Sequence, residues 1–174
     1  MDLYARVFGL IDARSFSSLW YWIALAVCWS MASHWILGVP WDLIRRAHLR
    51  GGQAAEDAEA MLRINVGRLL HVADEGGPWI LAALCAAFTA LLLLGFWYGV
   101  EFAQALFLLA FPFAIVGALS LRMARRIAGG LGRDGTLYRV LRRQRLTVQA
   151  IGIAAIFVTS LFGMYRNLAA LAVF

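Results

Sequence analysis

The sequence predicts an all-α polytopic membrane protein with four transmembrane helices and a cytoplasmic amphipathic helical connection. Hydrophobic residues make up 63% of the 174-residue chain, and the mean hydropathy is +0.74. An average soluble domain is only about 45–50% apolar. Four apolar runs each approach the roughly 20 residues that a helix needs to cross a bilayer. The charged residues gather between these runs, and the chain contains arginine but no lysine.

The apolar runs define the four predicted spans. None of them alternates polar and apolar residues with a period of two, so we expect helices and no strands. The first run is long for a signal peptide, follows a segment whose charges cancel, and lacks a small-residue cleavage site. We therefore expect a retained helix. The spans of this single domain, 1–174, are predicted at residues 19–39, 78–98, 102–121 and 146–166.

The connection at residues 40–77 is predicted to contain two helices. Pro40 suits the first turn of a helix, and the pair Gly51-Gly52 suits its end. A second helix is expected over residues 54–74, where an apolar stripe recurs at helical spacing: Ala58, Leu62, Val66, Leu69 and Ala73. Charged residues occupy the other positions, so this amphipathic helix is expected to lie on the membrane surface or against a partner.

The distribution of arginine predicts how the chain is threaded. The connection at residues 122–145 contains eight arginines and the one at residues 40–77 contains five, whereas the short hairpin at residues 99–101 contains none. Connections of this length that are rich in basic residues stay on the cytoplasmic side. Both long connections are therefore expected in the cytoplasm, and both termini in the periplasm, of a bacterial inner membrane.

Four arginines just before the fourth span form a candidate contact site for anionic phospholipid. These are Arg139, Arg142, Arg143 and Arg145. Basic residues at headgroup depth attract anionic lipid by about 1 kcal/mol each. An acidic surface of a protein partner is the alternative. Nucleic acid is not expected, because its bases need stacking aromatic side chains and only Tyr138 is near.

Polar residues at membrane depth are the other candidates. His34 lies near the predicted cytoplasmic end of the first span, but no second histidine stands at matching depth to complete a haem site. We expect it to be hydrogen-bonded near the interface. Glu101 and Arg166 both belong to the periplasmic side and have opposite charges, so they form a possible intramembrane pair. Separate solvated charges are the alternative.

The sequence contains no pattern that is typical of catalysis. It has no nucleophile–base pair, carboxylate dyad or phosphate-binding loop, and Cys28 and Cys85 fall in apolar runs without metal-ligand spacing. We therefore expect no enzymatic activity, no cofactor and no bound metal.

Three segments resemble a group of small four-helix inner-membrane proteins of alphaproteobacteria. They are RSFSSLWYWIALAVCWSMASHWILGVP at residues 14–40, LLGFWYGVEFAQALFLL at 93–109 and FVTSLFGMYRNL at 157–168. Proteins of this group are often labelled as components of an iron–sulfur assembly complex. What we carry over from the resemblance is the inner-membrane location.

The expected function is that of a non-catalytic accessory subunit or assembly factor. It would dock through its helices on a larger respiratory or photosynthetic membrane complex and contact anionic lipid. The alternative is a homo-oligomeric channel or a small transporter subunit. That alternative requires a polar stripe lining a path, and the spans contain few polar residues.

Overall fold

The computed structural model describes Phe16, residues 18–131 and residues 136–171. The N-terminal segment up to residue 15, whose side of the membrane was predicted above, lies outside the described residues, as does Arg133. The elements follow one another as α2 (Leu19–His34), β1 (Trp35–Ile36), β2 (Val39–Pro40), α3 (Trp41–Arg50), α4 (Gly52–Leu92), the π-helix η2 (Leu93–Trp97), α5 (Glu101–Ala128) and α6 (Leu137–Leu171).

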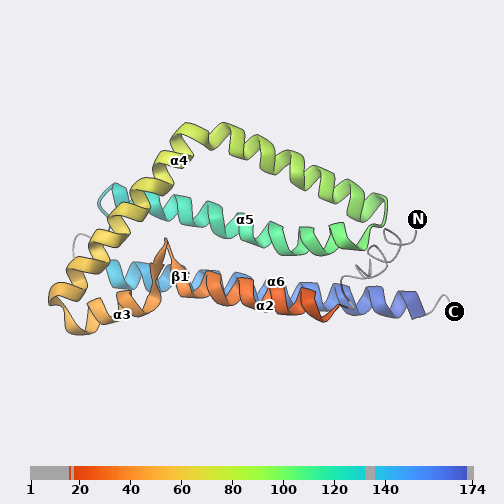
Figure 1. Ribbon diagram of the computed structural model, residues 1–174, viewed down its shortest axis with the longest axis horizontal. Coiled ribbons are helices and arrows are strands. Elements are labelled where there is room, and N and C mark those ends of the chain that lie inside the picture. The colour runs from red at the N-terminus through yellow and green to blue at the C-terminus, as the bar shows by residue number, and fades with distance from the viewer. Residues whose placement is uncertain (1–15, 17, 132–135, 172–174) are drawn as a thin grey trace, which may run out of the picture.

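The long helices run along the long axis of the molecule, and consecutive ones point in opposite directions (Figure 1). One end holds α3, the start of α4, the end of α5 and the start of α6, and we call it the arginine-rich end. The other end holds the start of α2, η2 and the end of α6, and we call it the hairpin end. Among the described residues, three helical segments are long and apolar enough to cross a membrane: Gly52–Trp97, Glu101–Ala128 and Leu137–Leu168. Their length and composition are those of a helical multi-pass membrane protein.

The helix α2 ends at His34, five residues before the predicted end of the first span at residue 39. The chain then forms a two-residue hairpin in which Trp35–Ile36 pairs antiparallel with Val39–Pro40, although the sequence predicted no strands. Leu37 and Gly38 both have positive φ, at 51° and 74°, as a tight two-residue hairpin turn requires. Pro40 explains the break, because it disfavours helical backbone at the residue before it.

The helix α4 is continuous from Gly52 to Leu92. The sequence predicted a break between residues 74 and 78, but Pro78 lies inside the helix. The helix changes direction along its length (Figure 1), in the part coloured between yellow and green. A proline removes one helical hydrogen bond, and a helix that continues through a proline is kinked at that point.

At the arginine-rich end, α5 and α6 continue as helix beyond the predicted third and fourth spans. The helix α5 continues to Ala128, and α6 begins at Leu137. Most of the arginines that were assigned to a connection therefore lie on the helices themselves. Arginine is a good helix former, so its charge ended the apolar run without ending the helix.

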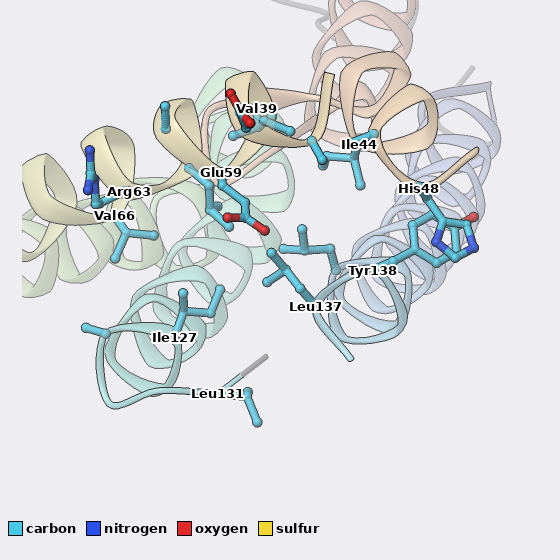
Figure 2. Close-up of a pocket in the computed structure, with 18 of the residues that line it drawn as sticks. Val39, Ile44, His48, Glu59, Arg63, Val66, Ile127, Leu131, Leu137 and Tyr138 are labelled. Atoms are coloured by element: carbon cyan, nitrogen blue, oxygen red, sulfur yellow. The ribbon is translucent and has the colours of Figure 1, made fainter. Parts of the chain in front are cut away.

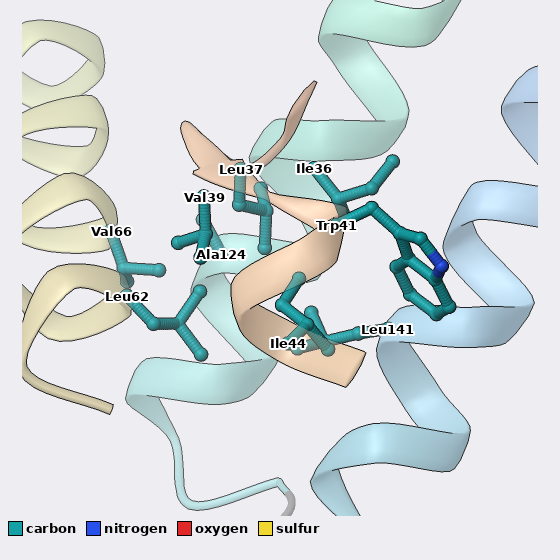
Figure 3. Close-up of a cluster of buried hydrophobic side chains, with 9 residues drawn as sticks. All are labelled: Ile36, Leu37, Val39, Trp41, Ile44, Leu62, Val66, Ala124 and Leu141. Atoms are coloured by element: carbon teal, nitrogen blue, oxygen red, sulfur yellow. The ribbon is translucent and has the colours of Figure 1, made fainter. Parts of the chain in front are cut away.

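The main hydrophobic core lies at the arginine-rich end (Figure 3). It joins the strand hairpin, α3, α4, α5 and α6 through nine buried residues: Ile36, Leu37, Val39, Trp41, Ile44, Leu62, Val66, Ala124 and Leu141. The buried residues of α4 are Ala58, Leu62 and Val66, three of the five residues of the predicted apolar stripe. Leu62 and Val66 pack into the core of the chain itself. A smaller cluster of Leu25, Trp29 and Ala155 joins α2 to α6.

Candidate functional site

An open groove of about 1030 Å³ lies at the arginine-rich end (Figure 2). Its volume is at the upper end of the roughly 300–1,000 Å³ that is typical of small-molecule pockets. It is lined by α3, α4, the end of α5 and the start of α6. The main core of the molecule forms its floor through Val39 and Ile44.

One wall of the groove is the first half of α4. Lining residues recur every three or four positions from Ala55 to Leu70, so this wall is roughly 22 Å long at 1.5 Å per residue. Several residues on this wall are alanine or glycine, so their small side chains leave space in the groove. A Cβ atom added at Gly67 would meet nothing within 4 Å. The groove therefore has room for side chains of another molecule along α4.

The opposite wall is made by the end of α5 and the start of α6. Ile127 and Leu131 come from the first, and Leu137, Tyr138 and Leu141 from the second. Apart from the tyrosine hydroxyl, these side chains are apolar. In Figure 2 the labelled side chains Ile127 and Leu137 face α4 across the groove. The interior of the groove is therefore mostly apolar.

Three charged side chains lie along α4 at the groove: Glu56, Glu59 and Arg63, all exposed. The carboxylate of Glu59 projects into the groove in Figure 2. Within the part of the chain that the structure describes, Glu59 forms no ion pair and no side-chain hydrogen bond, and Arg63 one turn later forms no ion pair. The groove thus presents an exposed carboxylate beside apolar walls.

A column of four stacked side chains fixes α3 against α6 beside the groove. The guanidinium of Arg145 lies 4.6 Å from the ring centroid of Trp41. The Trp41 ring lies 5.7 Å from Tyr138, whose ring stacks on His48 at 3.8 Å and 4°. Arg145 Nε also donates a hydrogen bond to the carbonyl oxygen of Ser33 at 3.2 Å, which ties in the end of α2.

The four arginines predicted to contact lipid therefore divide into two groups. Arg139, Arg142 and Arg143 are exposed on α6, whereas Arg145 is half-buried and bound to Trp41 and Ser33. Sequence reasoning missed the structural role of Arg145. Its two partners precede it by more than 100 residues, so no local spacing could have revealed the contact.

At the hairpin end, Glu101 binds backbone. Its Oε1 accepts a hydrogen bond from the amide N–H of Phe16 at 2.8 Å. The buried Phe16 ring packs edge-on against Phe162 at 5.5 Å. Among the described residues, Glu101 and Arg166 do not form an ion pair, and Arg166 Nε has no hydrogen-bond partner. Both residues lie at the same end of the bundle, and their coupling stays a prediction.

A second buried polar contact joins η2 to α5. The side chain of Gln104 is 5% exposed, and its Nε2 donates a hydrogen bond to the carbonyl oxygen of Gly95 at 2.7 Å. A Cβ atom added at Gly95 would lie 3.0 Å from the Gln104 amide nitrogen. Glycine is therefore needed here for the two backbones to approach.

His34 is exposed at the last residue of α2, and its ring lies edge-on to Trp35 at 6.1 Å. In the described ranges, no three His, Cys, Asp or Glu side chains gather where they could hold a metal ion. Among the described residues, no ion pair and no side-chain hydrogen bond joins His34 to another predicted site residue, although Arg145 binds the carbonyl oxygen of the neighbouring Ser33.

Comparisons of the chain with protein-family models, with curated proteins and with solved structures found no match.

Proposed function

We propose that this chain is a four-span protein of the bacterial inner membrane that acts as a non-catalytic accessory subunit or assembly factor of a larger membrane complex. In this proposal the arginine-rich end lies in the cytoplasm and both termini lie in the periplasm. The helix α2 is the first span. The other three spans are the membrane half of α4 (residues 78–92), the helix α5 and the helix α6.

The fourth span and the orientation are supported by how α2 and the arginines are placed. The helix α2 carries no charged residue apart from His34 at its end, and it packs on both α5 and α6. Its Tyr21 hydroxyl donates a hydrogen bond to the carbonyl oxygen of Ala105, and its Trp29 ring lies 4.5 Å from Phe113. The arginine-bearing stretches of α3, α4, α5 and α6 gather at one end, as the cytoplasmic side requires.

The observation that carries the accessory role is the uncovered surface of the membrane half of α4. Every residue from 78 to 87 is exposed. This half touches α5 through Phe88, which packs edge-on against Phe107 and Phe111. By contrast, α6 buries Gly152, Ala155 and Thr159 against the rest of the bundle. A span that its own chain leaves bare is available for packing against another membrane helix.

The accessory role is tested by placing a photoreactive amino acid at Ala82 or Ala86 in cells, with Ile153 on the exposed face of α6 as the control position. We expect cross-links from α4 to a different protein, which also co-purifies after gentle detergent extraction. Cross-links only between copies of this chain would favour the homo-oligomeric alternative. Lipid adducts alone would overturn the docking role.

The orientation is tested separately by reporter fusions at the C-terminus. A reporter that is active only after export should be active, because the proposed topology places Leu171 at the periplasmic side. Activity of a cytoplasmic reporter at the same position would reverse the topology.

A further inference from the structure

The groove lies outside the apolar spans. On α5, its lining begins at Ile127, six residues after the predicted span ends at 121, which is roughly 9 Å along the helix. On α6, its lining ends at Leu141, five residues before the span begins at 146, or roughly 7 Å. The headgroup layer on each side of a bilayer is only about 5–8 Å thick. Acyl chains that filled the groove would therefore have to leave the hydrocarbon layer.

An apolar groove that faces water is unfavourable unless it is covered. The α4 wall is roughly 22 Å long, which matches a helix of about four turns. Its residues recur with helical spacing, so they can interlock with a second helix that lies along them. This is the shape of a site that receives the apolar face of an amphipathic helix.

The charges at the groove indicate which helix would fit. Glu59 projects its carboxylate beside the apolar walls, and Glu56 lies one turn before it. On this wall the two acidic residues outnumber the single Arg63. The surrounding surface of this end is rich in arginine, so the preference for a basic helix depends on close contact with Glu59. A basic side chain on the incoming helix could pair with Glu59, and the pair would be screened less beside apolar walls than in open water.

We propose that the groove binds an amphipathic helix of a protein partner, with the apolar face of that helix against α4 and α6 and a basic side chain against Glu59. This inference deepens the proposed function, because it rests on the existence of a protein partner and assigns the chemistry of the segment that docks.

The test uses the full-length protein in nanodiscs of zwitterionic lipid, with empty nanodiscs as the blank. The probes are two fluorescent helical peptides of about 18 residues, a length that spans the groove. They share a leucine and alanine face and differ only in carrying lysine or glutamate beside it. We expect fluorescence anisotropy to show tighter binding of the lysine peptide. Equal binding of the two peptides, or tighter binding of the glutamate peptide, would overturn the inference.

Two variants locate the binding. Glu59→Gln should weaken binding of the lysine peptide about fivefold, the upper end for an exposed ion pair, and Glu59→Lys should reverse the preference between the peptides. Asp57→Asn is the matched control, because Asp57 is exposed on the same helix and does not line the groove. Loss of binding in the control to the same extent would show that the effect comes from net charge alone, which would contradict the inference.

Gly67→Phe fills the groove without a clash, since a Cβ atom at Gly67 meets nothing within 4 Å. The variant should weaken binding of the lysine peptide at least about tenfold, because the added ring excludes the peptide from the groove. Ile64→Phe adds bulk to an exposed position outside the groove and should leave binding unchanged. Unchanged binding in Gly67→Phe would overturn the inference.

The Gly67→Phe variant would also reveal whether a second copy of the chain or a phospholipid occupies the groove. A dimer in native mass spectrometry that this variant dissociates would assign the groove to a second copy of the chain. Retained phospholipid that the variant releases would assign it to lipid. Either result would overturn the peptide assignment. Failure of the cross-linking at Ala82 and Ala86 would instead remove the proposed docking of α4 and leave the peptide binding standing.

Discussion

The two halves of α4 belong to one continuous helix and yet are packed in opposite ways. The first half buries Ala58, Leu62 and Val66 in the core of the arginine-rich end (Figure 3). In the second half, every residue from 78 to 87 is exposed. The first half is polar on its outer face, whereas the second is apolar on all sides.

This difference follows from the solvent that each half meets. In water, an apolar side chain gains about 25 cal/mol per Å² by being covered, so the first half must bury its stripe against other elements of the chain. In a bilayer, lipid tails are as apolar as leucine, so the second half gains little by packing on its own chain. The same leucine-to-alanine substitution is therefore expected to lower the free energy of unfolding by different amounts in the two halves.

The largest effect is expected from Leu62→Ala. Leu62 is 4% exposed, so truncation leaves a cavity and should lower the free energy of unfolding by about 2–4 kcal/mol. Leu84→Ala in the second half, at 41% exposed, should cost much less. Thermal unfolding of both variants in the same detergent checks the difference. Equal losses would mean that the second half of α4 is covered in the folded protein.

The next effect concerns the exposed arginines of α6. Replacing Arg139, Arg142 and Arg143 with glutamine should weaken retention of anionic lipid by about 1 kcal/mol per charge, measured by mass spectrometry of co-purified cardiolipin. The melting temperature should hardly change. Arg145→Gln should instead lower the melting temperature and hardly change lipid retention, since it removes the contacts with Trp41 and Ser33. Lipid loss in Arg145→Gln alone would invert this assignment.

A smaller effect is expected where α2 crosses α6. A Cβ atom at Gly152 would lie 2.7 Å from Trp29 Cε3, so Gly152→Ala should cost about 1–3 kcal/mol by overpacking. Gly117→Ala on α5 is the control, because nothing lies within 4 Å of its added Cβ atom. The melting temperature should fall in the first variant and stay equal or rise in the second. A fall in neither would show that α2 does not pack here.

The smallest effect is expected from the coupling of Glu101 and Arg166. The carboxylate of Glu101 binds the Phe16 amide, and the two charged groups form no ion pair among the described residues. A double-mutant cycle with Glu101→Gln and Arg166→Gln should give a coupling below about 1 kcal/mol, as for two groups without direct contact. A coupling well above that range, measured by thermal unfolding, would show a direct pair.

Local patterns in the sequence predicted the features that depend on length and periodicity. The apolar runs marked α5, α6 and the second half of α4, and the spacing of Ala58, Leu62 and Val66 marked the buried face of the first half. Each of these is a property of neighbouring residues, so one segment is enough to reveal it.

Features that depend on distant contacts could not be predicted in this way. The helix α4 continues through Pro78, although proline by itself indicates a break. The partners of Glu101 and Arg145 are 85 and more than 100 residues away in the chain. The groove itself exists only because four segments meet, so no single segment predicts it.

The short length of α2 has a consequence for the surrounding bilayer. Its 16 residues extend over roughly 24 Å, whereas a typical hydrocarbon core is about 30 Å thick. Trp20 and Trp35 are exposed near its two ends. On the proposed topology they anchor α2 at the two interfaces, and this hydrophobic mismatch draws the two leaflets together along the α2 flank, while the longer α5 places no such demand on its own side. A protein threaded in this way would thin the membrane asymmetrically and favour regions where the bilayer is already thin.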